Sequence, residues 1–293
     1  MKKKIRFIIN PKSGVSDRNE MPDLVNRWVN KEHYDFEICF TEAPKHGIAL
    51  SKEAADKKYF AVISIGGDGS ANEVAKGLAE SETALGIIPT GSGNGMARHM
   101  QLPMQVEKAL GVINTGRIEK IDTLRVNDEF CLGTLGVGFD GHVAHLFANS
   151  SKRGYSTYAK LVLTEFYKYK PCIYEMDVDG KTISKECFLL TFANSSQFGN
   201  DAVIAPFASV QDGIVDISMI RQFSFAAVPG LIWRLMHNTI HKSKYFSMMR
   251  GKYIVLKNNS VLKGHIDGEP VTFNTDLHIK IIPKSLDIIV PSN

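Results

Sequence analysis

Short apolar runs alternate with amphipathic stretches through the first part of the chain. Continuous apolar runs predict strands, and apolar residues that recur every three to four positions predict helices. The run at 59–65, YFAVISI, is apolar throughout, as in a strand buried on both faces of a parallel sheet. Strands are expected at 5–9, 34–41, 59–65 and 84–89, and helices at 21–33, 47–57, 71–81, 94–100 and 104–114. This alternation predicts a doubly wound α/β domain over residues 1–122.

The pattern changes near Asp122. Most later segments alternate as strands do, and Asp179-Gly180 is a favourable two-residue hairpin turn. Helix-like spacing returns at 155–169 and 225–237. The sequence therefore predicts a second, β-rich, sandwich-like domain over residues 123–293 with a helical excursion. The strands are expected at 123–139, 172–195, 213–220, 252–258, 262–274 and 277–291. A site is expected in the cleft between two such domains.

Composition narrows the class of protein. Of 293 residues, 44% are hydrophobic, which is enough for a substantial core. The formal net charge of +4 does not imply a nucleic-acid partner, but it suits anionic ligands or an anionic membrane surface. Four scattered cysteines without a CxxC pair indicate reduced thiols rather than a disulfide framework or zinc site. Oligomeric state is not predicted.

The chain begins with basic and then apolar residues, MKKKIRFII, but lacks the longer apolar region and small-residue cleavage site of a signal peptide. No run reaches the roughly 18–20 apolar residues of a membrane-spanning helix. We expect a cytoplasmic protein, with peripheral contact at the inner membrane surface left open.

Three loops follow predicted strands of the first domain: NPKSG at 10–14, GGDGSAN at 66–72 and PTGSGNG at 89–95. Ligands bind along the carboxyl edge of an open α/β sheet. Glycine lets backbone N–H groups approach a phosphate, and a following helix N-terminus favours the negative charge. Each loop alone also fits an ordinary tight turn, but three on one edge favour a phosphate site. Further donors are expected from Ser13, Ser70, Thr90, Ser92 and Asn94.

Asp68 cannot assist a bare phosphate, because like charges repel. The carboxylate is explained if Mg²⁺, which binds one or two carboxylates together with phosphate oxygens, lies between them. The chain has no GxxxxGK[ST], so a P-loop is excluded. The run GSGNG at 91–95 is not the GxGxxG of a dinucleotide site.

In this order, NPKSG, GGDGSANEV and PTGSGNGMA resemble the catalytic domain shared by diacylglycerol kinases, sphingosine kinases and bacterial lipid kinases. The resemblance continues through GVGFDGHV, ANSSQFGNDAVIAPFASVQDGIVDI and HIDGEP, so it covers nearly the whole chain. It implies an N-terminal α/β nucleotide domain, a C-terminal β-sandwich, and transfer of the γ-phosphoryl group of ATP to a lipid hydroxyl. NAD kinases and phosphofructokinases share the GGDG loop more distantly.

The resemblance also implies site residues. It implies nucleotide contacts at Asn10, Thr41, Gly66, Gly67, Asp68, Gly69, Ser70, Ala71, Asn72 and Ser92. The loops themselves add Ser13, Gly14, Gly93 and Asn94 to the predicted nucleotide site. Glu269 of DGEP matches the general base, with Asp68 as the second choice. DGEP is also good turn chemistry, so the residues alone leave Glu269 open. Asp140 matches a lipid-headgroup position. A structural metal is expected at Asp212, with backbone oxygens near Ser209 and Ile214.

Two stretches, 152–170 and 225–252, mix lysine and arginine with aromatic residues. Such a mixture is typical of membrane interfaces, and also of a core helix with a solvated basic face. His142 and His145 lie near Asp140 without an evident third ligand, so we interpret them as structural.

The acceptor is left open between diacylglycerol and a sphingoid base. Bacterial diacylglycerol kinases commonly have GTxND in the third loop, whereas this chain has Gly95 where that acid would stand. Two alternatives are a kinase of a soluble acceptor such as NAD, and a nucleotide sensor without turnover. Retention of Asp68 and Glu269 argues against the sensor.

Overall fold

The structure is a computed structural model that describes residues 1–11, 20–150, 155–258 and 260–292. Contacts divide the chain into two compact units. The first comprises Met1–Asp122 with Pro283–Asn293, and the second comprises Thr123–Ile282. Each unit is described below by itself.

A parallel sheet forms the centre of the first unit, with strand order β2-β1-β3-β4-β16. Strands β3 and β4 are buried along their whole length, as their continuous apolar sequences predict. The strands are β1 (Lys3–Ile9), β2 (Tyr34–Phe40), β3 (Ala61–Gly66), β4 (Ala84–Pro89) and the end of β16 (Leu277–Val290).

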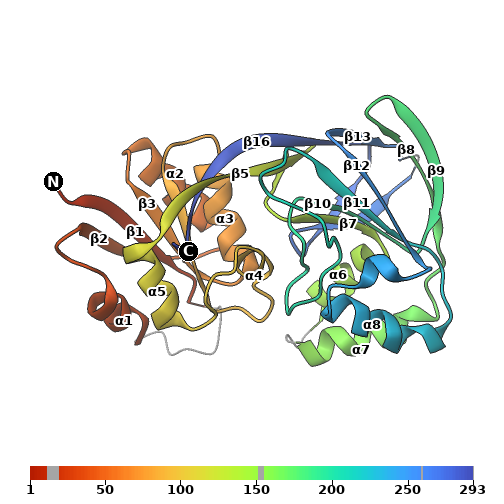
Figure 1. Ribbon diagram of the computed structural model, residues 1–293, viewed down its shortest axis with the longest axis horizontal. Coiled ribbons are helices and arrows are strands. Elements are labelled where there is room, and N and C mark those ends of the chain that lie inside the picture. The colour runs from red at the N-terminus through yellow and green to blue at the C-terminus, as the bar shows by residue number, and fades with distance from the viewer. Residues whose placement is uncertain (12–19, 151–154, 259, 293) are drawn as a thin grey trace. The chain divides into compact units, whose positions relative to one another are not determined.

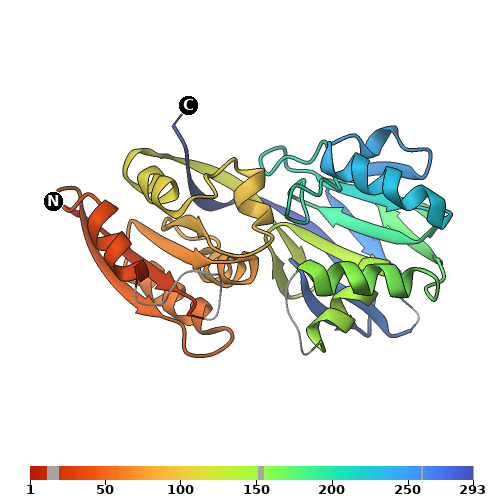
Figure 2. The same cartoon turned by 90° about the horizontal axis from the view of Figure 1, so that it is seen from below.

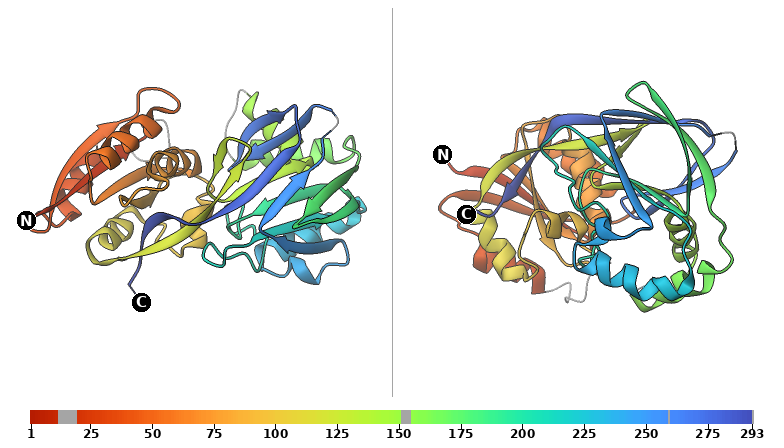
Figure 3. Two further views of the ribbon diagram at one scale, coloured as in Figure 1. Left: turned by 90° about the horizontal axis from the view of Figure 1, so that it is seen from above. Right: turned by 45° about the vertical axis from the view of Figure 1, so that its right-hand side comes forward.

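Helices cover both faces of this sheet (Figures 1 and 3). Helix α1 contacts α5, and α2 packs along α3. The first unit is therefore the doubly wound α/β domain that the alternating pattern predicted. Its helices are α1 (Glu20–Trp28), α2 (His46–Asp56), α3 (Asp68–Leu78), α4 (Gly95–His99) and α5 (Val106–Thr115).

The second unit is a sandwich of two sheets. One has the antiparallel order β16-β13-β8-β9, with β5 paired to β16 and β6 paired to β5, and the other has the order β12-β11-β10-β7-β14-β15. Strands β5 (Arg117–Val126) and β16 run through both units. The other strands are β6 (Glu129–Cys131), β7 (Thr134–Gly138), β8 (Cys172–Val178), β9 (Lys181–Cys187), β10 (Leu189–Ala193), β11 (Val215–Ile220), β12 (Phe246–Gly251), β13 (Tyr253–Leu256), β14 (Leu262–Ile266) and β15 (Glu269–Phe273).

The core of the sandwich lies between its two sheets. Val137, Phe192 and Ile217 of the six-stranded sheet belong to the same buried cluster as Met176 and Ile254 of the other sheet. Helices cover the outer face of the six-stranded sheet (Figures 1 and 2). The other sheet of the sandwich covers its inner face (Figure 3, left). These helices are α6 (Phe139–Ala148), α7 (Tyr155–Phe166), α8 (Val228–Met236) and the single turns η1 (Phe225–Ala227) and η2 (Ile240–Lys242).

The predicted fold class is confirmed: an α/β unit is followed by a β-sandwich-like unit. At the predicted Asp179-Gly180 hairpin both residues have positive φ, 51° and 85°, as a two-residue turn of this kind requires. Two elements were missed. Residues 139–148 form helix α6, which was not predicted, and 246–251 form strand β12 within a stretch interpreted as either a membrane interface or a core helix. Residues 283–293 pair with the first unit because β16 joins β4 through Ile288 and Leu85.

Helices α2 and α3 pack through glycine. A Cβ placed on Gly77 would lie 2.0 Å from Ser51 Oγ and 2.6 Å from the Ile48 carbonyl oxygen. The backbone oxygen cannot move aside without moving helix α2. Gly111, in helix α5, has nothing within 4 Å of the same position. Gly77 is therefore packed tightly against the neighbouring helix, whereas Gly111 has open space where a side chain would be.

We predict that Gly77→Ala destabilises the protein by about 1–3 kcal/mol, because the methyl group forces the two helices apart. Gly111→Ala is the matched control and should stabilise by roughly 0.5–1 kcal/mol through helix propensity. Urea unfolding of the two variants measures both changes. Equal changes in the free energy of unfolding for the two variants would show that the close packing of α2 against α3 does not constrain the fold.

Candidate active site

The predicted loops meet at the carboxyl edge of the parallel sheet. Each is tied to the neighbouring strand by a backbone hydrogen bond. Thr41 N–H donates to the Ile9 carbonyl at 2.9 Å, and Asn10 N–H donates to the Ile65 carbonyl at 3.1 Å. Thr90 N–H donates to the Gly66 carbonyl at 2.9 Å. Parallel pairing thus aligns four strand ends on one edge, where ligands of such sheets bind.

The second and third loops touch through their glycine backbones. A Cβ on Gly91 would lie 2.5 Å from the Cα of Gly67, and one on Gly67 would lie 3.2 Å from the Cα of Gly91. Gly67 precedes helix α3 in extended conformation, at φ −90° and ψ −168°. Glycine at position 67 is therefore favoured by the close contact between the loops and not by φ.

Asp68 bridges the same two loops. It is the first residue of α3, and its Oδ1 accepts a hydrogen bond from the N–H of Gly95, the first residue of α4, at 2.6 Å. The part of the chain that the structure describes holds no cluster of three or more His, Cys, Asp or Glu side chains suited to a metal. A cation held by the Asp68 carboxylate would take further ligands from phosphate oxygens and water. This donor set suits Mg²⁺.

Asn94 shapes the third loop. The residue is buried in left-handed conformation, at φ 53°, and precedes α4. Its Oδ1 accepts from Gly91 N–H at 3.1 Å, and its Nδ2 donates to the Gly91 carbonyl at 2.7 Å. Ser92 is exposed at the loop tip, and Arg98 Nε donates to the Gly93 carbonyl at 3.2 Å. Asn94 is engaged within the loop, while Ser92 is accessible to a ligand.

The first and second loops are joined by side chains. Asn10 Nδ2 donates to Ser70 Oγ at 3.0 Å. Gly69 and Asn72 are partly buried beside them, and Ala71 is buried in the first turn of α3. Ser13 and Gly14 lie outside the described residues.

Two features of this edge were not found from the sequence. Glu73, on α3, accepts hydrogen bonds from the N–H groups of Lys45 and Gly47 at 2.8 and 3.0 Å, and so caps α2 from a neighbouring helix. Such a cap has no local sequence pattern. Burial lowers the pKa of His99, at the end of α4, to about 4, so this ring is neutral at pH 7 and adds no charge for a phosphate.

Glu269 begins strand β15 immediately after a tight turn. Asp267 and Gly268 form this turn with φ values of 49° and 84°. The Glu269 side chain is exposed, and its carboxylate makes no hydrogen bond or ion pair with any residue that the structure describes. The turn predicted from DGEP is therefore present, and it presents an accessible carboxylate.

Asp267 fixes this turn and was not singled out from the sequence. Its Oδ2 accepts from Leu132 N–H at 2.7 Å, and its Oδ1 accepts from Gly133 and Thr134 N–H at 2.7 and 2.9 Å. Burial raises the pKa of the Asp267 carboxyl, while the three backbone donors act in the opposite direction. The carboxylate thus holds the hairpin against the start of β7.

Asp140 lies in the first turn of α6 and is only 6% exposed. Its Oδ1 accepts from Gly141 N–H at 2.8 Å, and its Oδ2 lies 3.1 Å from His265 Nε2 and 3.5 Å from Thr191 Oγ1. The Asp140 carboxylate is therefore engaged by protein groups. Its predicted role at the lipid headgroup stays a prediction.

The predicted structural metal ligands lie in an exposed turn before β11. Asp212 Oδ1 accepts from Ile214 N–H at 3.1 Å, and Ser209 Oγ accepts from Gln211 N–H at 3.3 Å. Metal binding there stays a prediction. His142 Nε2 lies 3.0 Å from Glu165 Oε2, and His145 Nε2 lies 3.1 Å from the Val271 carbonyl oxygen, so the two rings have separate partners.

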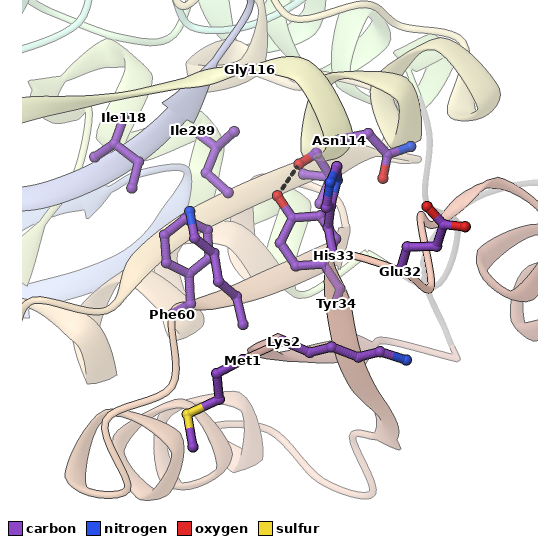
Figure 4. A pocket seen from close by; sticks show the side chains of 12 residues that line it. Met1, Lys2, Glu32, His33, Tyr34, Phe60, Asn114, Gly116, Ile118 and Ile289 are labelled. Atoms are coloured by element: carbon purple, nitrogen blue, oxygen red, sulfur yellow. Dashed lines mark hydrogen bonds between the residues drawn. The ribbon is translucent and has the colours of Figure 1, made fainter.

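A pocket of about 660 Å³ lies at the opposite, amino-terminal edge of the first unit's sheet (Figure 4). Its lining includes Lys3, His33, Tyr34 and Phe60. The Tyr34 hydroxyl donates to the Ile113 carbonyl, and Lys3 Nζ lies over the Phe60 ring. The pocket holds none of the predicted site residues, so we place the candidate active site at the carboxyl edge.

Large apolar side chains are exposed on α7 and directly after it, on η1 and on α8. The rings of Tyr167 and Phe225, 70% and 41% exposed, stack with centroids 4.9 Å apart. We call this set the α7–α8 patch: Leu163, Tyr167, Phe225, Ile232, Trp233 and Met236. Exposed lysines Lys160, Lys168 and Lys170 accompany α7. Among the helices of the described residues, none combines the length and apolarity needed to cross a bilayer.

Comparisons with known proteins agree with this architecture. Residues 4–126 match the model of the diacylglycerol kinase catalytic domain, and residues 133–290 match the YegS C-terminal NAD kinase beta sandwich-like domain. A protein of Chromohalobacter salexigens named "Probable lipid kinase YegS-like" is 24% identical over 97% of this chain and 92% of its own length. A diacylglycerol kinase of Staphylococcus aureus is 24% identical over 96% of this chain and 92% of its own length.

A solved structure of a diacylglycerol kinase from Bacillus anthracis has the same fold, with a TM-score of 0.74 at 18% identity. The match covers 98% of this chain and 97% of that one. The two family models together span both units described above. The chain belongs to the family of kinases that join a diacylglycerol kinase catalytic domain to a YegS-type β-sandwich domain.

Proposed function

We propose that this kinase transfers the γ-phosphoryl group of Mg-ATP to the hydroxyl of a lipid, either diacylglycerol or a sphingoid base. The observation that carries the proposal is the interlocked pair of glycine loops at the carboxyl edge, bridged by Asp68. Phosphoryl transfer depends on positioning and charge neutralisation more than on covalent chemistry. A rigid backbone cradle beside one carboxylate suits that requirement.

The nucleotide side uses the first unit. Asn10, Thr41, the loop at 66–72 and Ser92 would contact ATP, as would Ser13, Gly14 and Gly93. We assign Asn94 the role of holding the third loop in shape, because both of its amide groups are engaged with Gly91. Asp68 would hold Mg²⁺, which neutralises phosphate charge when bound.

The acceptor side uses the second unit. A base must take the proton of the attacking hydroxyl within hydrogen-bond reach. The exposed Glu269 carboxylate at a rigid turn supports this role. Asp267, which accepts three backbone N–H groups, has a structural task instead.

The α7–α8 patch supports a lipid acceptor. Aromatic side chains beside lysines suit the interface of an anionic bilayer, where each basic residue contributes about 1 kcal/mol. A kinase of a soluble acceptor has no need of such a surface. Peripheral contact with a membrane is therefore part of the proposal.

A soluble acceptor such as NAD is the second candidate. It is favoured by one observation, the match of residues 133–290 to a domain described as NAD kinase beta sandwich-like. The two candidates share the nucleotide site and differ in the acceptor, so one assay separates them.

We predict that γ-labelled ATP with Mg²⁺ labels diacylglycerol or a sphingoid base in mixed micelles and leaves NAD unlabelled. Asp68→Asn should lower the rate by about 10²-fold or more, because it removes the cation ligand and disturbs the nucleotide's position. Asp35→Asn, an exposed acid at the amino end of β2, is the matched control. Label on NAD alone would exclude the lipid acceptor.

Glu269→Gln should lower kcat by about 10²–10⁴-fold, the usual contribution of a general base, while KM for ATP stays close to that of the wild type. The exposed Glu186→Gln on strand β9 is the control and should keep wild-type kinetics. Steady-state kinetics at saturating lipid measure both. An unchanged kcat for Glu269→Gln would refute the base assignment.

Trp233→Ser should reduce binding to phosphatidylcholine vesicles that contain phosphatidylserine, measured by flotation, because Trp233 is 55% exposed in the patch. The matched control is Trp28→Ser, since Trp28 is also exposed but lies on α1 of the first unit. Equal flotation of all three proteins would argue against this surface as the membrane contact.

A further inference from the structure

A buried aspartate–histidine pair occupies the helix-covered face of the six-stranded sheet. Thr191 of β10 and His265 of β14 each pair in register with Gly136 of β7, so these three residues form a row across the sheet. Asp140, from helix α6, lies above Gly136. A Cβ on Gly136 would lie 2.2 Å from Asp140 Oδ2 and 2.3 Å from His265 Nε2. Only glycine leaves room for the pair.

The imidazole of His265 uses both of its nitrogens within the protein. Nε2 lies 3.1 Å from Asp140 Oδ2, and Nδ1 accepts the N–H of Gly268 at 3.3 Å. A nitrogen that accepts N–H carries no proton, so the ring proton is on Nε2 and is donated to Asp140. The ring is 5% exposed, and neither nitrogen is available to a substrate hydroxyl. The pair is therefore unsuited to act as the general base.

The contact with Gly268 connects the pair to the proposed base. Gly268 directly precedes Glu269 in the turn, and its φ of 84° is a conformation that strongly favours glycine. Asp267 holds one side of this turn through three backbone N–H groups, and His265 holds the next peptide through Nδ1. Asp140 fixes the orientation and tautomer of the imidazole, as carboxylates commonly do for functional histidines.

We infer that Asp140 and His265 are positioning residues that hold the Asp267-Gly268 turn so that Glu269 is presented in one geometry. This inference rests on the proposed role of Glu269. It gives Asp140 a task other than contact with the lipid headgroup. Among the described residues, Asp140 of α6 contacts the His265 ring directly, and Asp267 of the turn interacts with it electrostatically.

The test uses two substitutions of His265 that separate its two bonds. The amide nitrogen of glutamine falls near the position of Nε2, so His265→Gln keeps the bond to Asp140 and loses the acceptor for Gly268. The amide oxygen of asparagine falls near Nδ1, so His265→Asn keeps that acceptor. We predict that His265→Gln lowers kcat by about 10²-fold with little change in KM, because a small misplacement of a catalytic group has effects of this size. His265→Asn should retain more of kcat than His265→Gln.

A double-mutant cycle with Glu269→Gln distinguishes positioning from a general loss of structure. If His265 acts through Glu269, His265→Gln should not lower the residual rate of Glu269→Gln further. The inference would be overturned if His265→Gln lowered the rate by the same factor in the wild type and in Glu269→Gln. It would also be overturned if His265→Gln changed only KM for the lipid. His278→Gln is the control, since His278 is an exposed histidine bonded to Tyr253.

Hydrogen–deuterium exchange of the 265–270 segment gives a readout independent of activity. We expect exchange about tenfold faster in His265→Gln, the effect of losing one hydrogen bond, and near wild type in His265→Asn. Unchanged exchange in His265→Gln would overturn the inference even if lipid phosphorylation is confirmed. If the wild-type protein labels no lipid, the proposed function is refuted. If His265→Gln nevertheless exchanges faster than the wild type, the inference that His265 anchors the turn still holds.

Discussion

The parallel pairing of β3 with its neighbours β1 and β4 is the constraint on which the candidate site depends. Strands that run in one direction end at one edge, so the residues after them must meet there. A sheet covered on both faces by helices requires apolar strands, and this is why β3 and β4 are buried throughout. The residues proposed to bind the nucleotide therefore lie after the strands, in the glycine loops and at the start of α3.

Once the loops share an edge, their sequences are set by how closely they approach. The 2.5 Å that would separate a Cβ on Gly91 from the Cα of Gly67 leaves no room for any side chain. The Asp68–Gly95 hydrogen bond then fixes the distance between α3 and α4. The donor is the backbone N–H of Gly95, so this bond does not depend on the side chain at position 95.

The glycine loops and the two-unit fold were predictable because their signals are local: apolar runs, turn glycines and motif order. The contacts missed were those between segments distant in sequence. Asp267 is separated from its partners Leu132, Gly133 and Thr134 by more than a hundred residues, and Glu73 caps a helix that precedes it. Helix α6 was missed because its first turn contains Phe139-Asp140-Gly141, which locally favours a turn, whereas packing against β14 and β15 makes it helical.

The acidic residues of the second unit divide by environment into two classes. Asp140 and Asp267 accept hydrogen bonds from several protein groups, and these bonds occupy the oxygen lone pairs that a proton would need. Glu269 lies two residues from Asp267, with its carboxylate in solvent. A carboxylate that acts as a base must keep a lone pair free for the proton of the substrate. A carboxylate that supports the backbone uses its lone pairs in hydrogen bonds to the protein. The same short turn meets both demands, because the partly buried Asp267 holds the backbone while the exposed Glu269 is left for the reaction.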